Sequence, residues 1–303
     1  MKDVRIEYSE EVRSAIENRS PLVALESTII SHGLPRPQNL EVASEVEEIV
    51  RQRGATPATI AVLDGNVHIG LSPKQLIEIA NRDDIVKASS RDLAVVVAKK
   101  QSAATTVAAT SHLAVFAGIS VFATGGLGGV HRGAQESFDE SADLIALSQL
   151  DITIVCAGVK SILDVAATLE RLETLAIGLV GYQTHQFPGF YLTDSGFSIE
   201  HSVNSADEIA EIKKVRELLK TNRSALVVAN PVVKEMNRQL HDEILSAGLT
   251  LAKKEGVTGK AVTPFLLEYF HEASKGESLR VNIDIIKSNA ALAADIAIAS
   301  KNV

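Results

Sequence analysis

The chain has 303 residues, of which 46% are hydrophobic and 22% charged, so it can bury a large core. A net charge of −8, an aromatic content of only 4% and the lack of tryptophan argue against a surface for nucleic acid polymers. Because Cys156 is the single cysteine, a disulfide framework and a zinc site with several cysteine ligands are excluded.

The amino terminus and the hydropathy argue against a secreted or membrane-bound protein. Acidic residues run through the first twenty positions, which contain no apolar segment of the kind found in signal peptides. No apolar run reaches the roughly 18 residues needed to span a bilayer. We therefore expect a soluble, cytoplasmic protein without a membrane partner.

Apolar, strand-like segments alternate with segments of helical periodicity along the whole chain. Strands are predicted at Leu22–Ile30, Ala58–Leu63, Ile119–Ala123, Ile152–Ala157, Ile177–Tyr182 and Ala225–Ala229. Helices are predicted at Leu40–Gln52, Pro73–Asn81, Asp92–Lys100, Thr106–Ala117, Asp139–Gln149, Ile162–Leu175, Ala206–Leu219, Met236–Lys254, Pro264–Ala273 and Ile283–Ser300.

This pattern predicts an α/β fold. Nearly continuous Val, Ile and Leu strands separated by helices indicate a three-layer α/β/α sandwich with a mostly parallel central sheet. Asp64-Gly65-Asn66 predicts a hairpin turn that adds an antiparallel strand. Since no linker or repeat interrupts the pattern, residues 1–303 are expected to form a single domain. The polar stretch Thr184–Ser205 is either a loop or lid over a site or a surface excursion.

Two charged residues in the first third of the chain are candidates for chemistry. Glu26 interrupts the apolar strand, where an acid needs a partner, a metal or a raised pKa, and a protonated carboxyl makes a good general acid. The alternative is an ion pair with a buried base, for which Lys160 is a candidate. Lys87, which precedes serines and a predicted helix, is either a phosphate ligand or a solvated loop lysine.

A glycine-rich segment, Ala123-Thr-Gly-Gly-Leu-Gly-Gly-Val-His-Arg-Gly133, follows the third predicted strand. It does not match the dinucleotide-binding fingerprint, because His131 occupies the third glycine position, and it lacks the lysine of a P-loop. The glycines predict either a tight turn or a backbone that approaches a ligand closely. His131 and Arg132 at its end favour an anion site.

The next segment, Ser137-Phe-Asp-Glu-Ser-Ala-Asp143, has two interpretations. Ser137 and Glu140 fit a capping box, and acids in a first helical turn suit the helix dipole. Alternatively, Asp139 and Asp143, four residues apart on one helix face, form a site for a hydrated Mg²⁺ or Mn²⁺ ion or for sugar hydroxyls.

Lys160, in Thr153-Ile-Val-Cys-Ala-Gly-Val-Lys-Ser-Ile-Leu163, stands where a strand ends and a helix is predicted to start. Ser161 and Asp164 predict a capping box for that helix. Its positive end and partial burial would favour a neutral amine, which is a nucleophile towards carbonyl carbon. The alternative is a lysine that extends to solvent.

Seven motifs along the chain together resemble the pseudouridine-5′-phosphate glycosidase family, which is also called the indigoidine synthase A-like family. In chain order they are VALESTIISHG, ATGGLGGVHRGA, FDESADL, VCAGVKSILD, VGYQT, VVANP and TPFLL. The resemblance runs from about Pro21 to near the carboxyl terminus.

The resemblance implies a function. Family members cleave the C–C glycosidic bond of pseudouridine 5′-phosphate reversibly, giving uracil and ribose 5-phosphate. It implies that Lys160 is the covalent nucleophile, which forms an imine with the ring-opened sugar, and that Glu26 is the proton donor. It also implies one Mn²⁺ or other divalent ion per subunit, held by Asp139, and a homotrimer. The substrate contacts, to which the glycine-loop histidine is added here, are Lys87, Val107, His131, Ser141, Ala142 and Asp143.

The chemistry of a C-glycoside agrees with these roles, because carbon is a poor leaving group and simple acid catalysis does not suffice. A lysine imine on the opened sugar makes the C–C cleavage comparable to a reverse aldol step, where ordinary glycosidases use paired carboxylates. Two other functions remain open on the residues alone: a lysine-imine aldolase that acts on a sugar phosphate, and a non-catalytic regulator that binds a sugar phosphate.

Overall fold

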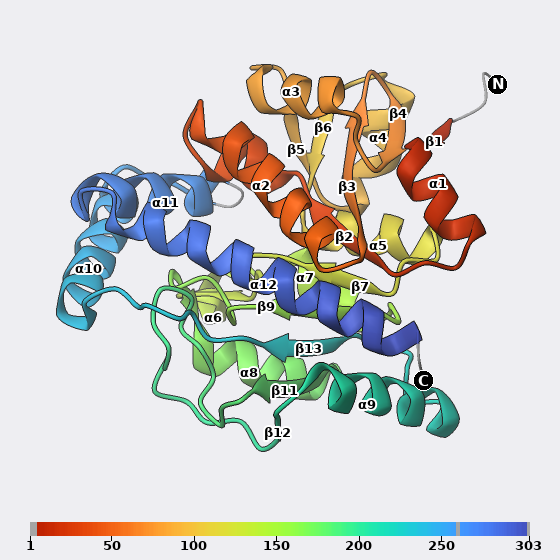
Figure 1. Ribbon diagram of the computed structural model, residues 1–303. Helices are drawn as coiled ribbons and strands as arrows, with labels where there is room; N and C mark the ends of the chain where they lie inside the picture. The colour runs from red at the N-terminus through yellow and green to blue at the C-terminus, as the bar shows by residue number, and fades with distance from the viewer. Residues whose placement is uncertain (1–4, 259–260, 302–303) are drawn as a thin grey trace.

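The computed structural model describes residues 5–258 and 261–301, which build a large, mostly parallel sheet covered by helices (Figure 1). In the described residues, neighbouring strands of this sheet run parallel except where β3 pairs with β4 and with β6. In spatial order the strands are β1 (Ile6–Tyr8), β4 (Asn66–Ile69), β3 (Thr56–Leu63), β2 (Leu22–Glu26), β7 (Val121–Ala123), β9 (Thr153–Cys156), β13 (Leu226–Ala229), β11 (Gly178–Tyr182) and β12 (Ser202–Val203), with β5 (Val86–Ala88) and β6 (Ala103–Thr105) branching from β3.

Helices cover both faces of the sheet, as the sequence predicts. The helices are α1 (Glu10–Glu17), α2 (Gln38–Gln52), α3 (Pro73–Asn81), α4 (Leu93–Ala98), α5 (Val107–Phe116), α6 (Ala134–Ser137), α7 (Ala142–Leu147), α8 (Val165–Thr174), α9 (Ala206–Leu219), α10 (Arg238–Lys254), α11 (Val262–Ala273) and α12 (Glu277–Lys301). Helix α12 crosses one face between α2 and α9 (Figure 1), and α5, α7 and α8 cover the other.

The side chains of each strand point alternately to the two faces of the sheet, and this alternation explains the three layers. Val23 and Leu25 of β2 belong to the same buried cluster as Val46 of α2 and Ile286 of α12. Ala24, between them, points to the opposite face and belongs to the cluster that contains residues of α5 and α7. Since successive side chains of a strand point to opposite faces, a continuous apolar strand requires helices on both sides. The predicted α/β/α sandwich is confirmed.

The order of the strands places a ligand site between β2 and β7. From β2 the chain passes through α2 to β3 on one side, and it later returns to β7 on the other side of β2. Such a reversal opens a crevice at the carboxyl ends of the two strands, where open α/β sheets bind ligands. The predicted hairpin also forms: β3 and β4 pair antiparallel around Asp64 and Gly65.

The first predicted strand, Leu22–Ile30, is too long. Strand β2 ends at Glu26, and a π-helical turn follows at Ile29–Gly33. The Ser27 hydroxyl donates to the Ile60 carbonyl oxygen (2.6 Å) at the point where the strand ends. Glu26 is therefore the last strand residue and not a residue inside a strand.

Three predicted helix starts are also wrong. Helix α12 begins at Glu277 and not at Ile283, and the other two corrections concern the site. The helix predicted from Asp139 begins at Ala142, where the Ser141 hydroxyl accepts a hydrogen bond from the Asp143 amide (3.2 Å). Asp139 and Asp143 therefore do not share a helix face, and Ser137 does not cap this helix, since it ends α6. The helix predicted from Ile162 begins three residues later, as described below.

Short strands and the first helix were not predicted. Strands β1, β5, β6 and β12, together with the two-stranded pair β8 (Val130–His131) and β10 (Leu163–Asp164), have only two or three residues each. Such segments are too short to show a period in the sequence. None of the helices among the described residues combines the length and the apolar character needed to cross a membrane.

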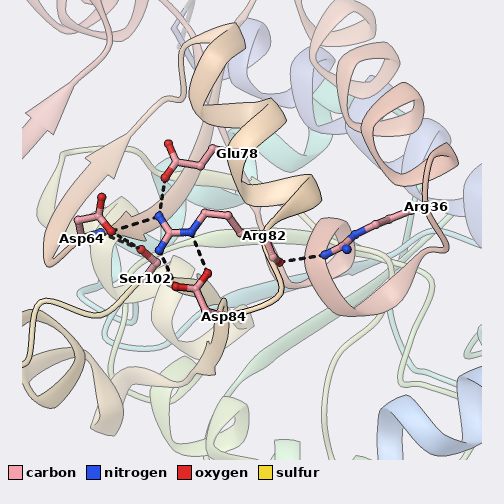
Figure 2. A network of polar contacts seen from close by, with 6 residues as sticks. All are labelled: Arg36, Asp64, Glu78, Arg82, Asp84 and Ser102. Carbon is pink, nitrogen blue, oxygen red and sulfur yellow. Dashed lines mark hydrogen bonds and ion pairs between the residues drawn. The ribbon is translucent and has the colours of Figure 1, made fainter.

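A surface network fixes the segment that leads into β5 (Figure 2). Arg82, at the end of α3, donates to the carboxylates of Glu78 (2.5 Å), Asp84 (2.7 Å) and Asp64 (3.1 Å). This arginine thereby joins α3, the β3–β4 turn and the residues just before β5. Lys87 follows in β5, so the network positions the strand that carries one of the predicted substrate ligands.

Candidate active site

A cavity of about 380 Å³ lies at the carboxyl ends of the central strands. All nine site residues predicted from the sequence line it, although they come from six separate stretches of the chain. They are Glu26, Lys87, Val107, His131, Asp139, Ser141, Ala142, Asp143 and Lys160. Geometry therefore brings the predicted residues together, whereas the role of each remains a proposal.

Two loops that extend the β7–β9 pairing hold Lys160 in the cavity. The Leu127 amide donates to the Gly158 carbonyl oxygen (2.9 Å), and the Lys160 amide donates to the Leu127 carbonyl oxygen (3.1 Å). The glycine-rich segment and the lysine segment thus continue as neighbours beyond the strands. Gly158 has a φ of +78°, and a Cβ atom there would lie 2.1 Å from the Pro188 carbonyl oxygen, so the turn requires glycine.

The expected helix start beside Lys160 is absent. Helix α8 begins at Val165, and its first turn is capped by Asp164, whose carboxylate accepts from the Ala167 amide (3.0 Å). The Ser161 hydroxyl, predicted as the cap, donates instead to the Gly189 carbonyl oxygen (2.9 Å). The helix dipole therefore does not act directly on Lys160.

The polar stretch Thr184–Ser205 supports the lysine loop. The Phe190 amide donates to the Ala157 carbonyl oxygen (3.0 Å), and Phe187 and Tyr191 are buried. This segment is therefore a loop at the site and not a simple surface excursion, because it packs directly against the turn that presents the nucleophile candidate.

Glu26 is buried at the end of β2, with only 8% of its surface exposed. Burial raises the pKa of its carboxyl, although the positive charge of Lys160 and a hydrogen bond from the Thr124 hydroxyl act in the opposite direction. The negative charge of Asp143 raises this pKa further. Glu26 thus has the environment expected of a proton donor near neutral pH.

Asp143 joins the glycine-rich loop to helix α5. One carboxylate oxygen accepts from the Ala108 amide and the other from the Gly128 amide, each at 2.9 Å. Gly128 has no room for a side chain, since a Cβ atom would lie 2.2 Å from the Ser141 hydroxyl oxygen and 2.7 Å from the Asp143 carboxylate. Close contact between loop and helix therefore explains one glycine of the motif.

His131 and Asp139 lie together at one end of the cavity, with the imidazole Nδ1 3.9 Å from the carboxylate Oδ2. Burial lowers the pKa of His131; Asp139 opposes this effect, and the charges of Lys160 and Lys87 add to it. The imidazole is therefore neutral near pH 7, and the contact with Asp139 is not a full ion pair.

The donor set restricts what metal site is possible. Within the described ranges, no three His, Cys, Asp or Glu side chains form a group that would hold an ion. Asp139 offers a single partly exposed carboxylate, and both oxygens of Asp143 already accept amide hydrogen bonds. These residues fit a hydrated Mg²⁺ or Mn²⁺ ion held mainly through water, and they do not fit an ion with three protein ligands.

The chain matches the sequence profile of the family described as "Indigoidine synthase A like protein" over residues 11–299. It belongs to this indigoidine synthase A family. Relatives named pseudouridine-5′-phosphate glycosidase are 56% identical in Salinispora tropica, over 97% of this chain and 92% of the relative, and 47% identical in Staphylococcus aureus, over 97% and 96%.

Solved structures of the indigoidine synthase A fold extend the comparison. The prealnumycin C-glycosynthase in complex with ribulose 5-phosphate is 30% identical, with a TM-score of 0.90 over 99% of this chain and 98% of that one. An indigoidine synthase A-like protein from Thermotoga maritima is 38% identical, with a TM-score of 0.88 over 97% and 96%.

Several residues of this indigoidine synthase A family member line the cavity but were not predicted as site residues. They include Thr28, Ser89, Arg91, Thr106, Phe138 and Thr263. Ser89 and Arg91 follow Lys87 in the sequence, so their proximity to it was a signal. Isolated threonines such as Thr106 carry no such signal, because only the fold brings them to the site.

A second, smaller compartment adjoins the first, and Glu26 and Lys160 line both. Phe190 and Leu267 contribute apolar surface to it, and Asn282 contributes an amide. The two candidate catalytic groups therefore stand at the junction of a polar and a more apolar space.

Proposed function

We propose that this protein is a C-glycosidase that reversibly cleaves pseudouridine 5′-phosphate to uracil and ribose 5-phosphate. The observation that carries the proposal is the position of Lys160 and Glu26 at one cavity, in a chain that is similar over nearly its whole length to pseudouridine-5′-phosphate glycosidases. A neighbour in fold that holds ribulose 5-phosphate supports a sugar phosphate as ligand.

In the proposed reaction, the sugar phosphate occupies the larger compartment and the uracil ring the smaller one, so that C1′ of the sugar lies beside Lys160. The lysine amine adds to C1′ as the bond to the ring oxygen breaks, and Glu26 gives its proton to that oxygen. The attached nitrogen then loses one proton, and its lone pair forms the protonated imine as the C1′–C5 bond breaks. The electrons of that bond leave with uracil, and C5 takes up one proton in place of the sugar, so the protons balance.

Water completes the cycle by hydrolysing the imine, which frees the Lys160 amine and releases ribose 5-phosphate. The raised pKa of Glu26 keeps its proton available for the ring-opening step. After ring opening, the Glu26 carboxylate is negatively charged. Because it interacts electrostatically with Lys160, it can stabilise the positively charged imine.

The metal belongs to the same proposal. Asp139 would hold one Mn²⁺ or similar ion per subunit, with water as the remaining ligands, and neutral His131 would hydrogen-bond to that water. When bound, such an ion offsets negative charge and orders water at its end of the cavity.

We extend the proposal to the number of domains, the cellular location and the oligomeric state of the protein. The continuous sheet and the family match over residues 11–299 support one domain for the chain. A buried free thiol at Cys156 suits the reducing cytoplasm. The family resemblance supports a homotrimer, with the small molecules of the reaction as its other partners.

Uracil release from pseudouridine 5′-phosphate, measured by chromatography with purified protein and Mn²⁺, tests this function. The protein should release uracil and ribose 5-phosphate in equal amounts, and it should form pseudouridine 5′-phosphate from the two products. A lysine-imine aldolase would react with the sugar phosphate but release no uracil, and a regulator would bind ribose 5-phosphate without turnover. Either of these results would overturn the proposal.

A further inference from the structure

Three polar side chains are buried behind the active site and take no direct part in the proposed reaction. They are Thr124, Asn230 and Asn289, with 0%, 7% and 1% of their surface exposed, and none of them lines either compartment. Asn230 belongs to the VVANP motif, which contributes no residue to the two compartments. Because polar groups in a core are unfavourable unless they are hydrogen-bonded, their partners indicate what they do.

The two asparagines form a pair that holds the backbone just after β7. The Asn289 side chain, in α12, donates to the carbonyl oxygens of Thr124 (2.7 Å) and Gly125 (3.4 Å). Its amide oxygen accepts from the Asn230 side chain (2.9 Å), whose own backbone amide donates to the Cys156 carbonyl oxygen (2.8 Å) at the end of β9. Since that amide oxygen faces a donor, Asn289 must turn its NH₂ group to the two carbonyls, so Asn230 fixes its orientation.

The backbone held in this way is also tied to the strand that leads to Lys160. The Thr124 amide donates to the Val155 carbonyl oxygen (3.0 Å), and the Ala157 amide donates to the Gly125 carbonyl oxygen (2.9 Å). Thr124 therefore has a fixed place relative to the segment that carries the nucleophile candidate.

The Thr124 side chain connects this backbone to the proton donor candidate. Its hydroxyl donates to Oε1 of Glu26, at the end of the neighbouring strand β2. While Oε1 accepts this bond, the acidic proton of the neutral carboxyl is carried by Oε2. Glu26 lines both compartments and Thr124 lines neither, so Thr124 can affect a substrate only through Glu26.

The charges around Glu26 do not replace this bond. Lys160, Asp143 and Lys87 all act on the Glu26 carboxyl. A charge attracts or repels from any direction, whereas a hydrogen bond requires a nearly linear arrangement of donor and acceptor. The hydroxyl of Thr124 therefore fixes the direction of the carboxyl, which the three charges do not.

We propose that Thr124, Asn289 and Asn230 are positioning residues that orient the Glu26 carboxyl towards the sugar ring oxygen. The asparagine pair holds the Thr124 backbone, and the Thr124 hydroxyl leaves Oε2 as the atom that gives the proton. The role of Glu26 rests on the proposed function, whereas the network that orients it rests on the geometry.

Steady-state uracil release tests the role in turnover. In Thr124→Val, kcat should fall about tenfold, as expected for one lost hydrogen bond to an ionisable group, and KM should not change. Thr124→Ser, which keeps the hydroxyl, should restore kcat. In a Glu26→Gln background, Thr124→Val should cause no further loss, because the proton that it positions is gone, whereas a general structural defect would slow both backgrounds equally.

The titration of Glu26 gives a measurement that does not depend on turnover. Carbon-13 NMR of protein with labelled glutamate follows the carboxyl, and its signal is assigned by its absence in Glu26→Gln. Because the Thr124 hydrogen bond lowers the Glu26 pKa, the titration midpoint should rise in Thr124→Val. It should rise by less in Asn230→Ala, which loosens the network from its far end and carries the same test if Thr124→Val does not fold.

Thr110→Val is the matched control. Thr110 is also fully buried, and its hydroxyl contacts Thr105 (2.8 Å) and not Glu26. This variant should keep the wild-type kcat and the wild-type midpoint, although it also loses a buried hydroxyl.

The outcomes separate this proposal from the proposed function. If the wild type releases uracil and Thr124→Val keeps both its kcat and its midpoint, the positioning role is wrong. A shift in Thr124→Val without any shift in Asn230→Ala would overturn the part assigned to the asparagines. If the midpoints shift as expected but the wild type releases no uracil, the network stands and the proposed function fails.

Discussion

At the scale of single residues, Glu26 shows how burial can suit a carboxyl to the proposed proton donation at a cost in stability. Its carboxyl pKa is raised in the folded protein above the ordinary value of 4.5. Below that value the carboxyl is protonated in both the folded and unfolded states. As the pH rises, the unfolded chain loses this proton first, so raising the pH progressively favours unfolding.

Glu26→Gln removes this cost, and its effect on stability should therefore depend on pH. The variant and the wild type should have equal stability near pH 4, and the variant should become the more stable protein as the pH rises above 4.5. Uracil release should fall by about 10²–10⁴-fold. Thermal unfolding between pH 4 and 9 checks the first expectation, and a stability difference that is constant over this range would contradict the raised pKa.

Lys160 marks the limit of what could be predicted residue by residue. Its place after a strand and the surrounding motif predicted a position at the cavity, which the structure has, whereas its role as nucleophile stays a prediction. The supposed helix start behind it was wrong, because Ser161 bonds to Gly189, which lies 28 residues later in the chain. A sequence pattern shows which residues can cap a helix, but it does not show which distant backbone groups compete for them.

At the scale of elements, the long strands and helices follow from periodicity, and the short ones depend on their neighbours. The central strands and α9 lie close to where the pattern predicts them. Strands β8 and β10 exist only because the glycine-rich loop and the lysine loop meet, with Leu163 opposite His131. Because these two strands form through tertiary contact, the local sequence pattern does not predict them.

The glycine-rich loop provides a prediction at this scale. In Gly128→Ala the new methyl group would displace the Ser141 hydroxyl or the Asp143 carboxylate, which lie 2.2 Å and 2.7 Å from its ideal position. Because small misplacements at an active site can cost about 10²-fold, kcat/KM should fall by at least that factor.

Gly125→Ala is the matched control for folding. Its methyl group would meet its nearest neighbours at 3.6 Å, an ordinary contact, so the variant should unfold at the same temperature as the wild type. Steady-state kinetics of Gly128→Ala and thermal unfolding of both variants separate the two effects; only the unfolding of Gly125→Ala is a control, since Gly125 lines the smaller compartment. Full activity in Gly128→Ala would show that the loop can move away from α7 without consequence.

At the scale of the whole molecule, the fold positions one site from segments spread over most of the sequence. A reversal of strand order between β2 and β7 opens the crevice, and the loops after β7 and β9 fill it with chemical groups. The sandwich and this site were predictable because strand ends of a parallel sheet share one edge. The second compartment was not, since Phe190 and Asn282 reach it from distant segments.

Removing and restoring the metal ion tests the proposed role of Asp139. Chelation should abolish uracil release, Mn²⁺ should restore it, and Asp139→Asn should weaken Mn²⁺ binding measured by calorimetry. Since the donor set offers one free carboxylate, the affinity should be modest and the bound ion should keep most of its water. Full turnover in a metal-free sample would contradict the role of Asp139.

Light scattering tests the proposed assembly. A homotrimer should have about three times the 32.3 kDa mass of the chain at micromolar concentration. A mass equal to that of one chain, in a sample with full activity, would contradict it.

The measurement that tests the central claim most directly is trapping of the lysine imine. The protein is incubated with ribose 5-phosphate and borohydride, and its intact mass and peptide masses are measured. The account predicts one adduct per chain with the mass of ribose 5-phosphate less one oxygen atom, located on Lys160 and absent from Lys160→Ala. An adduct on Lys87 instead, or near-normal uracil release by Lys160→Ala, would contradict it.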